Sequence, residues 1–331
     1  MDITLAKNFK QYHELVELLI HRGMSISDQT RAKRKLAQVG YYRLSGYWYP
    51  CRELEVDDHG NVVQCPIMKR PKRLDSFISN TKFEHVFELY VFDKKLRVLM
   101  LDALERIEIY IRSVLAHELG KGKRKEPGTG ELIPTPFAWQ DADLINNKFL
   151  RSKSGIPTAW EQWQRKHTQL IQRSREDCIL WYKKNDRTMP FWVVIEAWDF
   201  GTLSKYYGML KDTYRQRICQ RLGIEDKTQT GVLGSWLMEM NILRNRCAHH
   251  SRVWNQTFSS PLSLSSHSRF DDIRHNQQAR IRLYGLIEVM TFLIEQLSRH
   301  SSWRDDINRL LAQFPALPCC NLSALGVPNT V

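Results

Sequence analysis

The chain has 331 residues, 42% hydrophobic and 26% charged, a composition that excludes a disordered or fibrous protein and is typical of a folded globular one. Its 49 Lys and Arg residues outnumber its 36 Asp and Glu residues, and the resulting net charge of +13 favours a polyanionic partner such as nucleic acid. The sequence has no uncharged apolar run of the ~18 residues that a spanning helix needs, and its start, MDITLAKNFK, has no signal-peptide core, so we expect a cytoplasmic protein without a membrane partner.

The cysteines are odd in number and scattered, and no C-x-x-C pair occurs among them. This pattern is typical of reduced, buried thiols and predicts neither a disulfide framework nor a zinc site. The histidines do not complete a finger-like spacing with any cysteine. We therefore expect no metal and no cofactor.

The first 75 residues predict an N-terminal helical region. Apolar residues at helical spacing from Phe9 to Leu19, followed by Gly23, predict one helix, and Asp28 is a typical N-cap for a second helix that ends near Val39. The polar face of the second helix is either a solvated surface or a surface that binds RNA. Its basic residues are Arg31, Lys33, Arg34 and Lys35.

An aromatic and basic segment follows, with the sequence GYYRLSGYWYP over residues 40–50. Its rings are typical of a hydrophobic wedge that fixes the first helices to the rest of the chain; the alternative is base stacking beside Arg43 and Arg52. Turn-forming residues favour one small β-hairpin over residues 53–64. A basic loop then adds further candidate RNA-binding residues, which are Lys69, Arg70, Lys72 and Arg73.

Residues 76–300 predict a helical bundle. An apolar pattern without proline or glycine predicts one long helix from Thr81 to Leu119, about 55 Å in length, and further helices are expected from Thr158 and over 232–247 and 281–297. The fold class is all-α, a bundle with an N-terminal helical attachment (1–75) and a C-terminal helix and tail (301–331). Between the helices, a basic loop carries Lys121, Lys123, Arg124 and Lys125.

The segment RNRCAHHSRVWN, residues 244–255, closes the predicted helix over 232–247. Arginine offers fixed donors for a phosphate, and histidine moves protons near neutral pH. Together they suffice for RNA cleavage without a metal, in which the ribose 2′-OH attacks the adjacent phosphate. Arg244 and His249 lie about 140° apart on a continuous helix. The alternative is a basic, solvated helix end that interacts with the helix dipole.

Residues 243–255, LRNRCAHHSRVWN, resemble the signature of the Abi family of abortive-infection proteins, of the AbiD/AbiF type. Three more segments resemble motifs of that family in the same order: residues 40–50, then LERIE at 104–108 with Arg112, then PFW at 190–192 with Glu196 and FGTLS at 200–204. The resemblance ends near residue 300.

This family is assigned to the HEPN superfamily, and the resemblance implies a helical bundle whose R-x4-6-H motif forms a ribonuclease site, commonly at a homodimer interface. By the motif, Arg244 and His249 are catalytic and Asn245 supports them, whereas His250 fits the looser spacing. The predicted function is a metal-independent endoribonuclease that acts as an abortive-infection toxin, under the control of an RNA or protein partner. The alternative is a catalytically silent module that binds a structured RNA.

Two further readings are weighed against these. A second string of the same form, Arg112 to His117, lies inside the long helix, where its two side chains diverge, and Glu108 is placed for an ion pair with Arg112. A DNA-binding regulator that uses residues 8–40 as a helix-turn-helix lacks base-reading residues between phosphate anchors, so we do not expect DNA as a partner.

Overall fold

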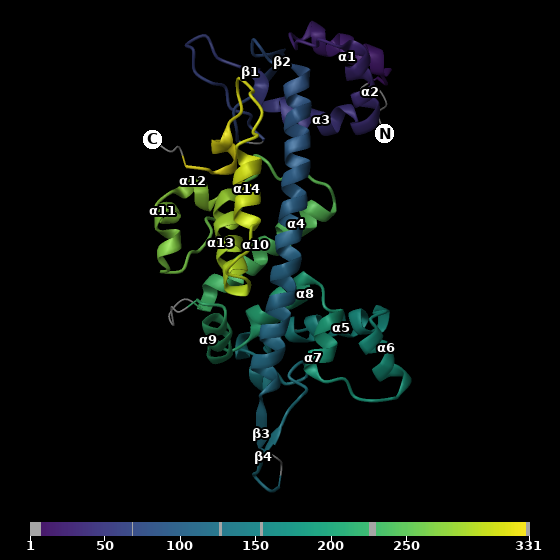
Figure 1. The fold of residues 1–331 in the computed structure, drawn as a ribbon, viewed down its shortest axis with the longest axis vertical. Coiled ribbons are helices and arrows are strands. Elements are labelled where there is room, and N and C mark those ends of the chain that lie inside the picture. Colours follow the sequence, from purple (N-terminus) through teal and green to yellow (C-terminus); the bar gives the residue numbers. More distant parts are fainter. Residues whose placement is uncertain (1–7, 68, 126–127, 153–154, 225–229, 329–331) are drawn as a thin grey trace. The chain divides into compact units, whose positions relative to one another are not determined.

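The fold is that of a computed structural model, which describes residues 8–67, 69–125, 128–152, 155–224 and 230–328, with residues 124–125 and 132–134 described by their backbone alone. The chain forms two compact units. Unit 1 contains residues 1–98 and 305–324, and unit 2 contains residues 99–304 and 325–331. Helices predominate in the described ranges and strands are short, which confirms the predicted all-α class (Figure 1).

The helices of unit 1 follow the predicted order. They are α1 (Tyr12–His21), α2 (Gln29–Val39), α3 (Tyr41–Trp48) and the first part of α4 (Figure 1). The Asp28 side chain accepts a hydrogen bond of 2.8 Å from the Arg31 backbone N–H and so caps α2 as predicted. Gly23, with a φ of 91°, follows the end of α1.

The aromatic segment forms helix α3 and packs into the core of unit 1. Tyr47 and Trp48 are buried, with exposed fractions of 2% and 0%. The Tyr47 hydroxyl donates a hydrogen bond of 2.7 Å to Asp93 of α4, and Arg97 pairs with the same carboxylate. Tyr47 and Trp48 therefore serve the predicted role of a hydrophobic wedge, because buried rings offer no face to a nucleobase.

Two antiparallel strands, β1 (Arg52–Leu54) and β2 (Arg73–Phe77), complete unit 1. The hairpin predicted over residues 53–64 is present in a short form. Val56 forms an antiparallel bridge with Val62, and the Val63 N–H donates a hydrogen bond of 2.9 Å to the Glu55 carbonyl. The strand partner of β1 lies further along the chain, in the segment predicted as a basic loop. Arg73 is thus part of a strand. The sequence did not reveal this, because main-chain pairing between distant segments cannot be inferred from turn residues alone.

The cysteine prediction is wrong in one respect. Cys51 and Cys319 form a disulfide across 268 residues of sequence, and both belong to unit 1. The Cys320 sulfur lies 3.9 Å from that of Cys51 and 3.8 Å from that of Cys319. Within the described ranges, these three residues form the one group that could offer three metal ligands. Spacing along the chain did not reveal the group, because only folding joins its members.

We expect the disulfide to stabilise unit 1. Cys51→Ser should lower the free energy of unfolding of this unit by about 2–5 kcal/mol, because the crosslink restricts a very long loop of the unfolded chain. Urea unfolding of oxidised protein measures the change, and Cys178→Ser, at an exposed free cysteine, is the control. Equal stability of the two variants with and without reductant would contradict this role.

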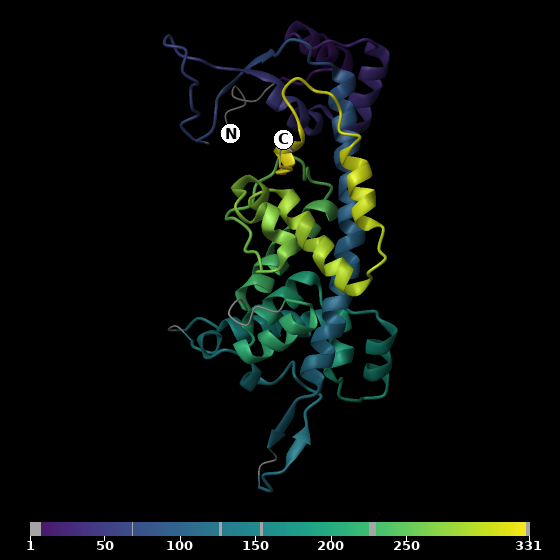
Figure 2. The same ribbon diagram turned by 60° about the vertical axis from the view of Figure 1, so that its left-hand side comes forward.

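Helix α4 (Phe83–Gly120) is 38 residues long and confirms the predicted long helix, with residues in both units. Beyond its C-terminal end, β3 (Lys123–Lys125) and β4 (Leu132–Pro134) pair as an antiparallel hairpin (Figure 2). The sequence predicted an irregular loop here. The glycine and lysine residues of this segment do not favour strands, so the sequence did not predict them. Strand formation depends on pairing with a neighbour more than on residue type.

The rest of unit 2 is built from helices of moderate length. Helix α5 begins with the predicted capping box, in which Thr158 and Glu161 exchange hydrogen bonds of 2.8 and 3.1 Å. The remaining α-helices are α5 (Ala159–Arg173), α6 (Asp177–Lys184), α7 (Phe191–Val194), α8 (Phe200–Met209), α9 (Asp212–Arg221), α10 (Thr230–Ala248), α11 (Asp271–Arg274), α12 (Gln277–Arg280), α13 (Leu283–Leu297) and α14 (Trp303–Leu311), which begins in unit 2 and lies mostly in unit 1. Short 3₁₀ turns occupy Tyr49–Cys51, Ala142–Leu144, Asn147–Phe149, Ile195–Ala197, Ser268–Phe270 and Leu322–Leu325.

The core of unit 2 positions α10. This helix packs against α8, α9 and α13, and Trp236 and Met240 of α10 are fully buried. Trp236 lies against Phe270 and Phe292, at ring-centroid distances of 5.7 and 5.9 Å. No helix in the described ranges combines the length and apolar character that a membrane span requires.

Candidate functional site

The predicted site lies where helix α10 ends. After Ala248 the chain turns through His250, whose φ of 57° is left-handed. The His250 N–H donates to Cys247 O at 3.0 Å and the Ser251 N–H donates to Arg246 O at 2.8 Å, the bonds of a Schellman cap. Glycine is the usual residue at this position of a helix cap. The backbone conformation therefore does not explain why the residue is histidine.

The four predicted catalytic residues lie on the last turn of α10 and the cap that follows. Asn245, His249 and His250 are exposed, and Arg244 is half-buried. Among the described contacts, neither the Arg244 guanidinium nor the His249 imidazole has a hydrogen bond or ion pair within the chain. Both are thus available to a ligand.

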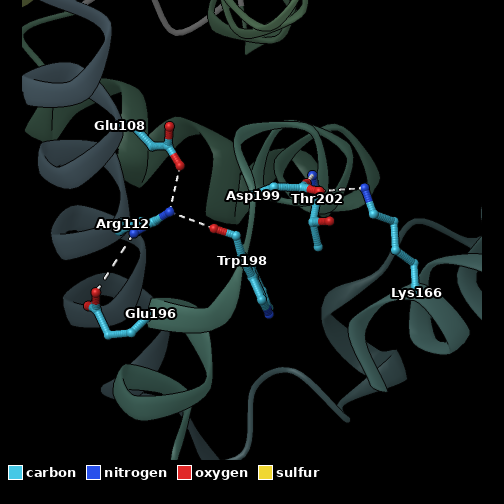
Figure 3. Close-up of polar contacts among 7 residues, drawn as sticks. All are labelled: Glu108, Arg112, Lys166, Glu196, Trp198, Asp199 and Thr202. Atoms are coloured by element: carbon cyan, nitrogen blue, oxygen red, sulfur yellow. Dashed lines mark hydrogen bonds and ion pairs between the residues drawn. The ribbon is translucent and has the colours of Figure 1, made fainter. Parts of the chain in front are cut away.

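Next to this helix end, Arg112 of α4 holds a network of polar contacts (Figure 3). Its Nη2 donates to Glu108 Oε1 and to the backbone carbonyl of Trp198, each at 2.5 Å. Its Nη1 lies 3.8 Å from Glu196 Oε2. The motif segments of residues 104–112 and 190–204, far apart in sequence, therefore meet at one guanidinium.

The Glu108 carboxyl connects this network to α10. Burial raises its pKa above the ordinary value, while the positive charges of Arg112 and Arg244 act in the opposite direction. Arg244 is therefore within electrostatic reach of Glu108. The two arginines differ in their contacts. Arg112 forms hydrogen bonds and an ion pair with several groups, whereas Arg244 has neither among the described contacts.

Asp199 forms the other side of the cluster at the start of α8 (Figure 3). Its carboxylate accepts hydrogen bonds of 2.7 Å from Lys166 Nζ and from the Thr202 N–H. Burial raises the pKa of Asp199, but these hydrogen bonds outweigh that effect and hold the pKa below its usual value. A side chain at Gly201 would meet Asn241 of α10 at 3.5 Å, so α8 and α10 lie in close contact here.

One comparison with known proteins matched a range of residues that contains the four motif segments. A family model described as "Abi-like protein" matches residues 34–255, more than half of the chain. The chain belongs to the Abi-like protein family. The comparisons with curated proteins and with solved structures gave no match. Membership in the Abi-like family indicates a role in abortive infection.

Arg112 and His117, the second string of the same form, have different surroundings in this Abi-like protein. Arg112 is bound by Glu108, Trp198 and Glu196, whereas His117 is exposed. The Glu108–Arg112 ion pair predicted from their i, i+4 spacing is confirmed. Arg112 is a structural residue that joins α4 to the segment before α8.

This role predicts a difference between two alanine variants. Arg112→Ala should lower the free energy of unfolding of unit 2 by about 2–4 kcal/mol, because it leaves a half-buried carboxylate without its partner. His117→Ala should change it by less than about 0.5 kcal/mol. Chemical denaturation of both variants tests the assignment, and a larger loss for His117→Ala would reverse it.

The predicted RNA-binding residues of α2 lie mainly on its exposed side. Arg31, Lys33 and Arg34 are exposed, while Lys35 lies 4.7 Å from the ring centroid of Phe87. On α3, Arg43 is exposed as well.

A second basic group of unit 1 surrounds Tyr49. Three guanidinium groups lie 5.7–6.0 Å from the centroid of its ring, those of Arg52, Arg70 and Arg73. Lys69 is exposed nearby in sequence, whereas Lys72 pairs with Glu55 at 2.7 Å. In unit 2, Lys121 pairs with Glu118 at 3.1 Å and Lys123 is exposed; the side chains of Arg124 and Lys125 lie outside the described part of the structure.

Sequence reasoning missed His167 of α5, for which no motif gives a signal. The imidazole is 3% exposed, and its Nδ1 accepts a hydrogen bond of 2.8 Å from Trp198 Nε1. Burial lowers its pKa from 6.5 to about 4, so the ring is neutral at physiological pH. Lys166 and Asp199 were also missed, although Asp199 three residues before Thr202 is a recognisable N-cap signal.

The depressed pKa of His167 predicts a pH dependence of stability. Between pH 6.5 and about 4 the unfolded chain binds a proton that the folded protein does not. The stability is therefore complete above pH 6.5 and falls with decreasing pH, by about 3 kcal/mol across this window. Urea unfolding at pH 7.5 and 4.5 should show a smaller decrease for His167→Gln, which accepts the same hydrogen bond but does not titrate. Parallel decreases in both proteins would exclude His167 as the cause.

Proposed function

We propose that this Abi-like protein is a metal-independent endoribonuclease of the HEPN type, which acts in abortive infection by cleaving RNA at the end of α10. The observation that carries the proposal is the exposed end of this helix, where Arg244 and His249 have no described partner within the chain. In the cleavage step, a histidine takes the proton of the ribose 2′-OH as its oxygen attacks the phosphate. The bond from phosphorus to the 5′-oxygen breaks, and a second imidazolium donates a proton to that oxygen.

Each proposed catalytic residue has a distinct task. Arg244 stabilises the additional negative charge on the phosphate in the transition state. His249 and His250 exchange the protons, and Asn245 orients the phosphate or an imidazole. The charge of Arg244 is felt by Glu108, but the two form no ion pair among the described contacts, so the guanidinium keeps its donors for the phosphate.

The proposed active form is a two-fold homodimer. On a continuous helix Arg244 and His249 would lie about 140° apart, and α10 ends at Ala248, one residue before His249. In this proposal, one copy presents the two groups on different sides. A second copy that packs on the same helix face brings its histidine to the phosphate held by the first. Met238 and Ile242 support this arrangement, because they are apolar and exposed by 48% and 39% on the helix face that also carries Asn245 and His249.

The decisive experiment is the incubation of purified protein with single-stranded RNA in EDTA. We expect cleavage products with a 2′,3′-cyclic phosphate and a 5′-hydroxyl, because the attack is intramolecular. Cleavage that appears only with added Mg²⁺ or Mn²⁺ would refute the mechanism.

The second candidate function is a silent RNA-binding module. It is favoured by the cluster of three guanidinium groups around Tyr49, which is suited to phosphates and stacked bases. In the proposed ribonuclease, the same group and the basic side of α2 hold a structured RNA partner. RNA binding that falls steeply with salt, without cleavage in any buffer, would favour the module instead.

A further inference from the structure

A cavity of about 300 Å³ lies beside α5 in unit 2, and no step of the proposed cleavage uses it. One wall is aromatic and formed by Trp139 and His167, whose ring centroids lie 4.8 Å apart with 31° between their planes. His167 in turn stacks on Trp163, at 5.2 Å and 16°. The His167 ring is therefore held between Trp139 and Trp163. The volume is at the lower end of the range for ligand sites, enough for one small ring system.

The single buried polar group of this wall is the His167 imidazole. Its Nδ1 accepts from Trp198 Nε1, so the proton of the neutral ring is on Nε2. Within the described ranges, no group accepts a hydrogen bond from Nε2, although the residue is 97% buried and lines the cavity. The Nε2 proton is therefore available to an acceptor atom of a ligand in the cavity.

The other lining residues restrict the class of ligand. Gln140 and Gln172 are exposed and offer amide groups at the rim, and Arg187 offers a positive charge. The Trp139 N–H donates to Met189 O at 3.2 Å, so this tryptophan presents only its ring to the cavity. An aromatic wall, one ring N–H donor, rim amides and one cation match a planar heterocycle attached to a phosphate.

We propose that this cavity binds one nucleobase, which stacks on Trp139 and accepts a hydrogen bond from His167 Nε2. The base belongs either to a bound RNA chain or to a free nucleotide, and both sources share this chemistry. Trp198 connects the cavity to the polar network beside α10. Its side chain donates a hydrogen bond to His167, and its backbone carbonyl accepts one from Arg112 (Figure 3). The RNA source rests on the proposed function, whereas base binding itself does not.

The test is calorimetric titration of the full chain carrying His249→Ala with AMP, GMP, CMP and UMP. The cleavage step is disabled in this background, so failure of the ribonuclease proposal leaves the binding result intact. At least one nucleotide should bind, and Thr168→Trp should weaken its binding by about tenfold or more, because Thr168 is exposed and lines the cavity. His167→Phe, which keeps an aromatic ring but removes both the Nε2 donor and the Nδ1 acceptor of the Trp198 N–H, should have a similar effect. Gln169→Ala, an exposed position on α5 outside the lining, should bind as the parent does.

Oligoribonucleotides distinguish the two sources. If an RNA base occupies the cavity, a six-nucleotide RNA should displace the mononucleotide, and the same RNA without bases should not. If a free nucleotide is the ligand, neither oligomer should displace it. The proposal is overturned if no mononucleotide or oligomer binds, or if binding is equal in the parent, Thr168→Trp and His167→Phe.

Discussion

Arg244→Ala and His249→Ala should each lower the rate of RNA cleavage by about 10³-fold or more, because one removes the stabilising charge on the phosphate and the other removes a proton carrier. The cleavage rate in EDTA measures the effect, and loss of toxicity on overexpression should accompany it. Neither side chain has a hydrogen bond or ion pair among the described contacts, and Arg244 is half-buried while His249 is exposed, so the free energy of unfolding should change by less than about 1 kcal/mol.

His250→Gly separates the chemistry of this turn from its structure. Glycine is better suited than histidine to a φ of 57°, so the variant should be at least as stable as the natural protein. Loss of cleavage in a stable His250→Gly protein assigns the imidazole a chemical task. Asp186→Gly is the control, because Asp186 is exposed and has a φ of 49° outside the site.

Wild-type cleavage in both Arg244→Ala and His249→Ala would show that the active site lies elsewhere.

Ile242→Glu and Met238→Glu should convert the proposed dimer into monomers and reduce cleavage by about 100-fold or more. Each buries a carboxylate at the centre of a two-fold interface, where it also faces its own copy. Light scattering measures the molecular mass, and cleavage of single-stranded RNA measures the activity. The positions are part-exposed in the single chain, so the fold of unit 2 should persist.

Leu297→Glu is the matched control for these variants. Leu297 is 41% exposed at the end of α13, on a different helix from Met238 and Ile242, and its substitution should alter neither mass nor cleavage. A protein that is monomeric and fully active at all concentrations would contradict the dimer. In that case Arg244 and His249 would have to act from within one chain.

The helical architecture of this protein could be predicted from local sequence features. The apolar pattern without proline or glycine located α4, and the cap residues Asp28 and Thr158 located the starts of α2 and α5. These features are local, since a helix closes its hydrogen bonds within four residues. The R-x4-H string and the other family motifs were equally readable, because each is a short contiguous segment.

The contacts between side chains and strands that are distant in sequence became visible only in the folded structure. The strand pairing of β1 with β2 and the disulfide of Cys51 with Cys319 join distant segments, and local propensity contains no information about such contacts. The same holds for His167, which became a buried, neutral donor only because Trp198 and Trp163 enclose it. Arg112 and Arg244 look alike in sequence, yet packing gives the first a set of partners and leaves the second available.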